Sequence, residues 1–409
     1  MARIGILNFP GHMNQGANLT AYALQKVLQD WGHEAVNLHL RNNYRPEKEP
    51  IYTDFADANI RITSQSAVGE TSMQIFNSQF DTFIVGSDQV WRNTSESMFT
   101  WKTCMESCFH LAFAAPGKRR IAVAASFGRD EYNQNPEVRR QFAQELRRFT
   151  AISVREKSGV EILKEIGDFE TTVLIDPVFY IDEKQWYQFA DAKRYEGRSL
   201  MAYNAFFHQE EVHLLQKEMS DEFDFVDVCT GNTAQWLAYI RDARFVVTDS
   251  FHVCCFCLIF GTPFACLSNA GFGRARFEEL AETFHFSKER IIDSDKVENL
   301  AEEVRRLMLL PYDTAEIKQA ILQGREKAHV WLKSALAAPV PAWSGPDFVW
   351  KSRKEIREEQ MANNLWKRHY LSQRNLRIAR ILLRISPFFR KKLRAKIEKH
   401  ELLLRRYSW

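Results

Sequence analysis

The sequence of 409 residues lacks any run of about 18 uncharged apolar residues, the length that an α-helix needs to span a bilayer. Residues 1–16 contain only a short apolar stretch and no small-residue cleavage site, which favours a first β-strand over a secretion signal. Hydrophobic residues make up 45% and charged residues 26% of the chain, as is typical of soluble globular proteins. We therefore expect a cytoplasmic protein.

Disulfide frameworks, metal sites and dinucleotide binding are also disfavoured. The chain has seven cysteines, an odd number, and four of them lie between residues 254 and 266, in or just after an apolar stretch. Reduced, buried thiols account for this distribution better than disulfides do. The Cys-Cys-x-Cys spacing differs from that of zinc knuckles, so we predict no metal site. The turn at residues 12–18 contains a single glycine, whereas the NAD-binding fingerprint is glycine-rich.

The net charge of +3 is unevenly distributed. Residues 365–409 contain fourteen Lys or Arg and two Glu, a net charge of +12, so residues 1–364 carry −9. In residues 365–385 apolar and basic side chains interleave as in an amphipathic helix, which Pro387 ends. Such a helix either lies on an anionic membrane surface or packs on the body of the protein or on a second subunit. The acidic body and the lack of a binding motif disfavour nucleic acid.

Strand-like apolar runs alternate with helix-like segments, a pattern typical of α/β folds with parallel sheets. We expect two doubly wound, Rossmann-like domains with an interdomain cleft, residues 1–180 and 195–337. The proline-rich residues 338–348 predict a linker, and residues 349–409 predict a basic helical extension. Residues 41–74 are polar, and we expect only loops and short helices there. The expected strands are residues 4–7, 35–38, 80–85, 121–125, 151–154, 172–175, 199–203, 223–228, 245–247 and 264–267.

Residues 245–264 predict a strand, a turn and a helix. A β-branched apolar run is followed by Thr248-Asp249-Ser250, whose side chains favour the start of a helix. His252 thus lies at a helix N-terminus beyond the carboxyl end of a strand, where α/β folds bind anions. His252 is therefore a candidate ligand-binding residue, and the alternative is a surface or structurally satisfied histidine.

Polar residues also follow three expected strands of the first domain. They lie at residues 86–92, 126–128 and 155–159. Because the carboxyl ends of parallel strands meet at one edge of a sheet, we expect these residues to lie at the same edge.

Six stretches together resemble the polysaccharide pyruvyl transferases, whose two-domain fold is like that of the GT-B glycosyltransferases. They occur in the expected order over roughly residues 1–285, and the combination of GSDQVW with TDSFH is specific. The stretches are NQGANLTAYALQ (14–25), FDTFIVGSDQVWR (80–92), AASFG (124–128), ISVREKSG (152–159), IDPVF (175–179) and VVTDSFHVCCFCLIFGTPF (246–264).

The resemblance implies transfer of the enolpyruvyl unit of phosphoenolpyruvate to two hydroxyls of a sugar, which gives a pyruvate ketal and releases phosphate without a cofactor. The acceptor would be a sugar of a surface polysaccharide or of its lipid-linked precursor. His252 would act as the general acid, because a group that titrates near neutrality suits proton delivery to the methylene carbon. Arg155 would neutralise the phosphate. Phosphoenolpyruvate would also bind Ser250 and either Arg274 or Arg276, and the spacing does not say which of the two arginines it is.

Each arginine also has a plainer interpretation. Arg155 could form a structural ion pair with a neighbouring carboxylate. Arg274 and Arg276 could instead pair with Glu278 or Glu279 at the start of a helix.

The resemblance places acceptor binding on the first domain. Asp88 could orient or deprotonate a sugar hydroxyl or merely stabilise a turn, and Trp91 could stack on a sugar or belong to the core. Val253 replaces a glycine that often follows the histidine in this family, which would keep the donor further from that backbone. Two other functions fit, a GT-B-like glycosyltransferase that uses a nucleotide sugar and a non-catalytic membrane-associated scaffold. The acceptor-side candidates are Asn14, Gly86, Ser87, Asp88, Gln89 and Trp91.

Overall fold

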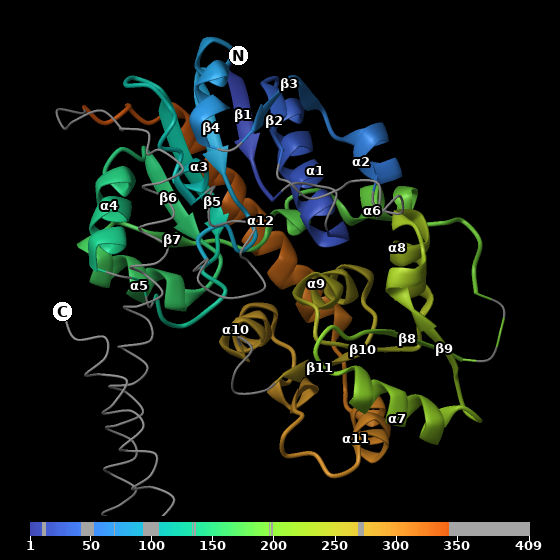
Figure 1. Ribbon diagram of the computed structural model, residues 1–409. Helices are drawn as coiled ribbons and strands as arrows, with labels where there is room; N and C mark the ends of the chain where they lie inside the picture. The colour runs from blue at the N-terminus through green and yellow to red at the C-terminus, as the bar shows by residue number, and fades with distance from the viewer. Residues whose placement is uncertain are drawn as a thin grey trace, which may run out of the picture.

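The structure is a computed structural model. It describes residues 1–9, 14–41, 53–68, 70–92, 106–132, 134, 136–195, 197, 199–268 and 274–342. The predicted extension, residues 349–409, and most of the predicted linker lie outside the described residues. Within the described ranges, no helix is long and apolar enough to cross a bilayer. The described elements form two halves, each built on a parallel sheet (Figure 1).

The first half is built on a sheet whose described strands have the order β3-β2-β1-β4-β5-β6-β7. Strand β1 pairs with both β2 and β4, so the chain winds outward from the centre in both directions, as in doubly wound folds. The strands are β1 (Arg3–Leu7), β2 (Glu34–Arg41), β3 (Ile62–Val68), β4 (Thr82–Val85), β5 (Arg119–Ala125), β6 (Ala151–Val154) and β7 (Thr172–Val173). The helices are α1 (Gln15–Asp30), α2 (Thr53–Asn59), η3 (Glu70–Ser78), α3 (Glu106–Phe109), α4 (Pro136–Leu146) and α5 (Lys157–Gly167).

The second half is built on a parallel sheet with the strand order β12-β11-β10-β8-β9 among the described residues. The short helices η5 (Pro177–Phe179) and α6 (Glu183–Phe189) connect the two halves. The strands are β8 (Leu200–Asn204), β9 (Asp224–Asp227), β10 (Phe245–Thr248), β11 (Phe264–Ser268) and β12 (Ile291–Asp293). The helices are α7 (Gln209–Met219), η6 (Val228–Thr230), α8 (Thr233–Asp242), α9 (Phe251–Phe260), α10 (Arg274–Phe284), η7 (Lys288–Arg290), α11 (Leu300–Leu309) and α12 (Thr314–Ala337).

One apolar core joins the two halves. Because side chains alternate between the faces of a strand, Ile6 belongs to this joint core, whereas Leu7 faces a separate core on the other side of the first sheet. In the second sheet, Val246 belongs to the joint core and Val247 to the core beneath α7 and α11. Helices α1, α9 and α12 contribute buried residues to the joint core. The two sheets are therefore held together by apolar packing.

Helix α12 runs from the second half back to the first (Figure 1). The Nε group of Arg325 donates a 2.8 Å hydrogen bond to the carbonyl of Phe179, and Nε2 of His329 lies 2.9 Å from the carbonyl of Tyr180. Just beyond the helix, the Arg119 guanidinium donates to the carbonyl of Ala338. The helix thus spans both halves and ends at the start of β5.

Three elements differ from the sequence-based expectation. Strand β3 lies in a segment where we predicted only loops and short helices, because its sequence ITSQSAV is too polar to show a strand pattern and its place is at the sheet edge. Helix α1 begins at Gln15, inside the segment 12–18 that we expected to form a turn, since the Asn14 side chain accepts the N–H of Gly16 and caps the helix. The three-residue strand β12 carries too little pattern to be predicted.

Six of the seven cysteines lie within the described residues, and these six are free thiols. The cysteines of α9 pack in the joint core. Burial raises the pKa of Cys255 and of Cys257 well above its usual value, so these thiols stay protonated and unreactive.

Candidate active site

A cavity of about 420 Å³ opens between the two halves. One wall comes from the segments that follow β4, β5 and β6, and the other comes from the segments that follow β8 and β10. The cavity brings together seven of the predicted site residues, Asn14, Asp88, Gln89, Arg155, Ser250, His252 and Arg276. Its other lining residues are Arg92, Gly128, Phe206, Phe207, Asp249 and Phe251.

The N-terminus of helix α9 opens onto this cavity. Thr248 ends β10, and its hydroxyl oxygen accepts the N–H of Ser250 at 3.0 Å, which fixes the turn. Within the described residues, the Ser250 side chain makes no capping hydrogen bond with α9. Its hydroxyl and the first N–H groups of the helix can therefore bind an anion. Val253, where the family often has glycine, is buried in the joint core and does not narrow the cavity.

His252 is wedged against the first turn of α1. A Cβ atom on Gly16 would lie 2.2 Å from Nδ1 of His252, so a residue larger than glycine does not fit there. The Nε2 atom of His252 lies 3.2 Å from Oγ1 of Thr20 and 3.8 Å from Oδ2 of Asp176. Residues of the first half thus position a histidine that the second half supplies.

Asp176 lies at the centre of the hydrogen-bond network, although sequence analysis did not single it out. Its side chain is fully buried. Its signals were the Asp-Pro pair after an expected strand and its place in the stretch IDPVF, and in the structure it caps η5. The carboxylate accepts hydrogen bonds from Ser87 Oγ (2.9 Å), Arg155 Nη1 (3.0 Å), Val178 N–H (3.1 Å) and Thr20 Oγ1 (3.2 Å).

Burial and charge act in opposite directions on His252 and Asp176. Burial lowers the pKa of His252 below its usual value, although Asp176 and Asp88 act to raise it. Burial acts to raise the pKa of Asp176, but His252 when protonated, the charge of Arg155 and the hydrogen bonds from Val178 and Arg155 together lower it. The charge of Arg155 and the two hydrogen bonds remain when His252 is neutral. Near pH 7, His252 is therefore neutral and Asp176 is charged. A neutral imidazole in this position can accept a proton and pass it on.

Arg155 is buried, and its Nε group lies 3.6 Å from Oε2 of Glu156 in an ion pair. Its side chain is 3% exposed, and its guanidinium carbon lies 4.0 Å from the ring centre of Phe251. Burial favours the neutral form, but Glu156, Asp176 and Asp88 outweigh it and raise the pKa of Arg155. Among the described residues, its Nε and Nη2 groups have no hydrogen-bond partner. A permanently charged, buried guanidinium with free donors is suited to binding an anion.

The structure separates Arg276 from Arg274. Arg276 lines the cavity, and its buried Nε group has no hydrogen-bond partner within the described part of the chain. Burial and the charge of Arg155 lower the pKa of Arg276. Arg274 instead donates a 2.7 Å hydrogen bond to Glu278, one of the two ion pairs that the sequence left open. Arg276 is thus the arginine that can serve a ligand in the cavity.

Polar groups form the first-half wall of the cavity. Asp88 has a left-handed backbone with φ of 69°, and its carboxylate accepts the N–H of Gln89 at 2.8 Å. Arg92 donates a 2.6 Å hydrogen bond to Oε1 of Gln89. A Cβ atom on Gly128 would lie 2.6 Å from that same oxygen, so glycine allows Gln89 to occupy its place. Together with Asn14, these side chains give the wall hydrogen-bonding capacity.

Three acceptor-side candidates lie behind this wall. Trp91 is 2% exposed, packs against Phe142 and donates its indole N–H to the carbonyl of Phe109. It therefore belongs to the core, and the interpretation of Trp91 as a sugar-stacking residue is wrong. Ser87 is buried and supports Asp176, while Gly86 passes close to the backbone of β5 with φ of 110°.

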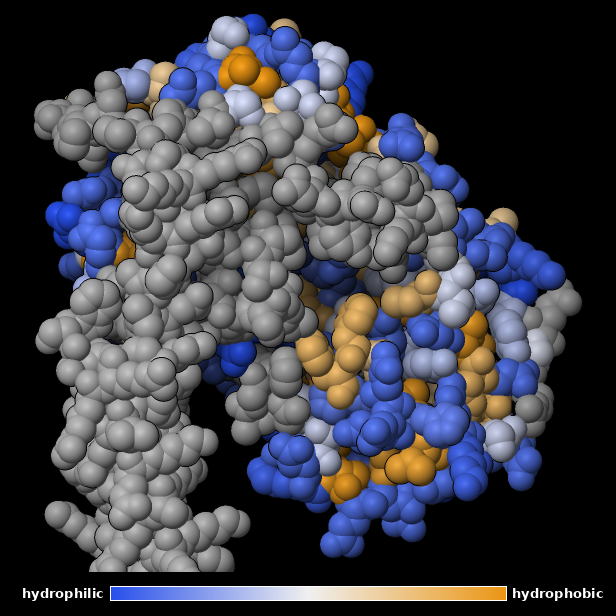
Figure 2. All heavy atoms as spheres, in the orientation of Figure 1, coloured by the Kyte–Doolittle hydropathy of each residue, from blue (hydrophilic) through white to orange (hydrophobic). Residues whose placement is uncertain are grey.

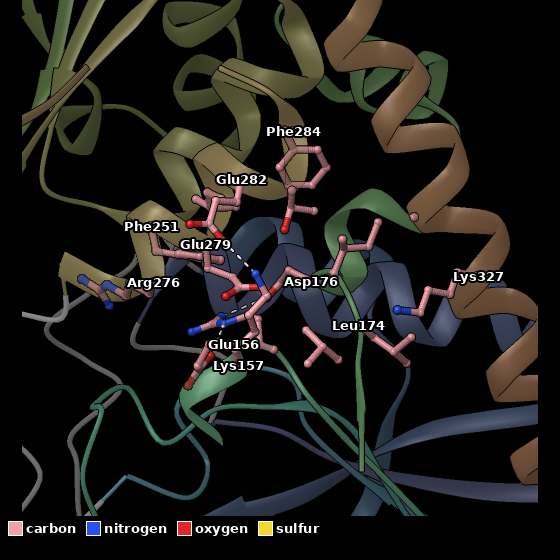
Figure 3. Close-up of a pocket in the computed structure, with 16 residues that line it drawn as sticks. Glu156, Lys157, Leu174, Asp176, Phe251, Arg276, Glu279, Glu282, Phe284 and Lys327 are labelled. Atoms are coloured by element: carbon pink, nitrogen blue, oxygen red, sulfur yellow. Dashed lines mark hydrogen bonds and ion pairs between the residues drawn. The ribbon is translucent and has the colours of Figure 1, made fainter. Parts of the chain in front are cut away.

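A second cavity of about 300 Å³ adjoins the first and shares Arg155, Phe251 and Arg276 with it (Figure 3). Lys157 lies beside this cavity, and its ammonium group is 2.7 Å from Glu282 of α10. Figure 3 shows these two side chains directed toward each other. An exposed ion pair thus links α5 of the first half to α10 of the second.

A second histidine–aspartate pair lies beside the first cavity. Nδ1 of His208 is 3.0 Å from Oδ2 of Asp249, and the backbone N–H groups of Phe206 and Phe207 donate to the same carboxylate. The hydrogen bond to Asp249 raises the pKa of His208 against the effect of burial. Sequence analysis gave Asp249 only a place in a turn and did not single out His208, Phe206 or Phe207.

The family model named "Polysaccharide pyruvyl transferase" matches residues 14–271, more than half of the chain. The chain belongs to the polysaccharide pyruvyl transferase family. The matched region contains the candidates from Asn14 to His252 and ends before Arg274 and Arg276. No curated protein matches this family member.

Solved structures similar to this pyruvyl transferase family member have the GT-B fold. The UDP-GlcNAc 2-epimerase from Neisseria meningitidis, bound to UDP-GlcNAc, is 12% identical, covers 82% of this chain and 100% of its own, and has a TM-score of 0.53. A putative UDP-N-acetylglucosamine 2-epimerase from Listeria monocytogenes is 13% identical, covers 86% and 100%, and also has a TM-score of 0.53. At this identity the likeness concerns the fold alone. It confirms the predicted GT-B-like fold.

Proposed function

We propose that this chain transfers the enolpyruvyl group of phosphoenolpyruvate to two hydroxyls of a sugar, forming a pyruvate ketal and releasing phosphate. The observation that carries the proposal is the pair of arginines, Arg155 and Arg276, whose free N–H groups lie beside His252 at the N-terminus of α9. Phosphoenolpyruvate carries a phosphate and a carboxylate, and both groups require such donors. Family membership supports this choice of donor.

The proposed reaction begins with transfer of a proton from His252 to the methylene carbon. The neighbouring carbon then becomes a cationic centre, which the first sugar hydroxyl attacks as it loses its proton. The carbon–oxygen bond to phosphate breaks, and the second hydroxyl attacks the same carbon. Of the two hydroxyl protons, one restores His252 and the other leaves with phosphate, so atoms and charge balance.

Donor binding supplies the charge state that this reaction needs. His252 rests neutral because burial lowers its pKa. A bound phosphate beside the ring favours the imidazolium and raises the pKa, so His252 takes up a proton when the donor arrives. The contacts with Thr20 and Asp176 hold the ring during this exchange.

In the proposed reaction, residues of the first-half wall bind the acceptor sugar and deprotonate it. Asp88 takes the proton from the first attacking hydroxyl and passes it to the departing phosphate, which restores the carboxylate, and Gln89 and Asn14 orient the sugar. The acceptor is a sugar of a surface polysaccharide or of its lipid-linked precursor. Residues 349–409 bind an anionic membrane surface and so bring the protein close to that acceptor.

Calorimetric titration of phosphoenolpyruvate into the full chain tests the donor, with UDP-GlcNAc as the parallel ligand. We expect saturable binding of phosphoenolpyruvate and weaker binding in Arg155→Lys. Lysine keeps the charge next to Asp176 but lacks the forked guanidinium. Circular dichroism of the variant controls for folding.

Two results would overturn the proposal. Binding of UDP-GlcNAc without binding of phosphoenolpyruvate would favour a nucleotide-sugar glycosyltransferase. Binding of neither ligand would favour the non-catalytic scaffold. Loss of phosphoenolpyruvate binding in Arg155→Lys with retained fold would tie the donor to this cavity.

A further inference from the structure

Two phenylalanines give the cavity an apolar surface on its second-half side. Phe206 and Phe207 follow β8 and line the cavity, and they are 58% and 41% exposed. Two large aromatic side chains that lie next to each other in the sequence and both line a cavity give it an apolar surface on which a ligand can pack. Figure 2 shows that the second half, drawn in the lower part of the view, presents apolar surface among hydrophilic residues.

The backbone beneath these rings is fixed. The N–H of Phe206 donates to the Asp249 carboxylate at 2.9 Å, and the N–H of Phe207 donates at 2.8 Å. His208 completes the clamp with its 3.0 Å contact to the same carboxylate. Asp249 directly precedes Ser250 and lies three residues before His252, so the aromatic segment has a set position relative to the start of α9.

The opposite wall is polar. Asp88, Gln89 and Asn14 come from the first half, whereas the two rings come from the second. The surface of a pyranose is also part polar and part apolar. Its hydroxyls lie around the edge of the ring, and its axial C–H groups form an apolar face. Aromatic rings in proteins pack well against such apolar faces, while carboxylates and amides bind the hydroxyls.

We propose that Phe206 and Phe207 form the platform on which the acceptor pyranose packs its apolar C–H face, so that its reacting hydroxyls point toward Asp88. The inference rests on the proposed function and assigns to the second half the stacking role that the sequence suggested for Trp91. It also names the substrate feature that is read, a pyranose with an unobstructed apolar face.

Saturation-transfer NMR on the full chain tests the platform directly. The probes are the methyl β-pyranosides of glucose, galactose, mannose and N-acetylglucosamine, each measured alone and with inorganic phosphate. For at least one probe, we expect saturation to be strongest at the axial ring protons. We expect about five- to tenfold weaker binding in Phe206→Ala, in line with the strength of an aromatic contact.

The chain offers a matched control. Leu214 on α7 is also 58% exposed and does not line the cavity, so Leu214→Ala truncates an apolar side chain of the same fractional exposure outside the site. We expect Leu214→Ala to bind the probes like the wild type, and Phe206→Tyr to retain binding because it keeps the ring. In turnover assays, Phe206→Ala should raise the KM for the acceptor and leave the affinity for phosphoenolpyruvate unchanged.

Each alternative result contradicts a different claim. Equal binding by Phe206→Ala and the wild type, or no pyranoside binding by the wild type, would overturn the platform while phosphoenolpyruvate binding still upheld the proposed function. Ring-dependent pyranoside binding without phosphoenolpyruvate binding would leave the platform standing and overturn the proposed donor.

Discussion

Two histidines beside the cavity are each close to an aspartate, yet their pKa values shift in opposite directions. Nε2 of His252 is 3.8 Å from Asp176, whereas Nδ1 of His208 is 3.0 Å from Asp249. Burial dominates at His252 and lowers its pKa. The hydrogen bond to Asp249 dominates at His208 and raises its pKa. Proximity to a carboxylate therefore does not by itself decide the direction in which the pKa of a buried histidine shifts.

Burial and the neighbouring charges explain the difference. Asp176 acts to raise the pKa of His252, but burial of the imidazole lowers it more, so the carboxylate does not prevail. Arg155 also repels a proton on His252. Asp249 faces no such cation among its described hydrogen-bond partners, which are backbone N–H groups and His208. We infer that one pair is suited to proton transfer and the other to holding a loop.

The largest expected effect is on turnover, which we expect to fall much further when His252 is substituted than when His208 is substituted. Substitution His252→Ala should lower kcat by about 10²- to 10⁴-fold, because it removes the proposed proton donor. Substitution His208→Gln should reduce turnover far less, since it loosens only the clamp on Phe206 and Phe207. Phosphate release from phosphoenolpyruvate in the presence of acceptor measures both variants. Equal losses would mean that the two pairs do not differ in role.

The second prediction concerns stability at the buried pair. Substitution Asp176→Ala should lower the free energy of unfolding by about 3–5 kcal/mol, because it leaves the buried Arg155 charge without its closest partner. Urea denaturation followed by circular dichroism measures the loss. Asp313→Ala, which removes the cap of α12, serves as the control and should cost about 1 kcal/mol. A loss at Asp176 no greater than that of the control would show that Arg155 is not held mainly by this carboxylate.

The third prediction extends the comparison to the arginines that surround His252. Substitution Arg276→Ala should weaken phosphoenolpyruvate binding by about 10- to 100-fold, as expected for loss of charged hydrogen bonds. Arg274→Ala should leave it nearly unchanged, because Arg274 pairs with Glu278 instead of lining the cavity. Calorimetry measures both dissociation constants. If Arg274→Ala weakened phosphoenolpyruvate binding more than Arg276→Ala did, Arg274 would be the arginine that contacts the donor, and our assignment of Arg276 would be wrong.

Much of this site could be predicted from the sequence, because its signals are local. The run that ends in Thr248-Asp249-Ser250 indicated a strand end and a helix start, and His252 follows from that pattern. Parallel topology then placed Asp88 and Arg155 at the same edge of the first sheet. Each inference needed only neighbouring residues and a rule about strand ends.

The missed residues depend on packing between distant segments. Asp176 is 76 positions from His252 in the sequence, and only the joining of the halves by α1 and α9 brings them together. Trp91 looked suitable for stacking on a sugar because it follows a polar turn, but the core formed with Phe142 encloses it. Phe206 looked like an ordinary apolar residue, and its exposure follows from the clamp that Asp249 forms.

The smallest expected effect is the most direct test of the comparison, since it has opposite signs at the two histidines. An unfolded histidine has a pKa of about 6.5. Because the folded pKa of His252 is lowered, its neutral form contributes stability above about pH 6.5 that is lost as the pH falls toward the folded pKa. The folded pKa of His208 is raised, so its contribution is complete below about pH 6.5 and is lost as the pH rises through the folded pKa.

Urea unfolding between about pH 5 and 8 measures both contributions. The stability of the wild type relative to His252→Gln should grow with pH, and its stability relative to His208→Gln should shrink. If both differences change in the same direction, a single electrostatic environment governs both pairs, and the assignment of proton transfer to one and support to the other fails.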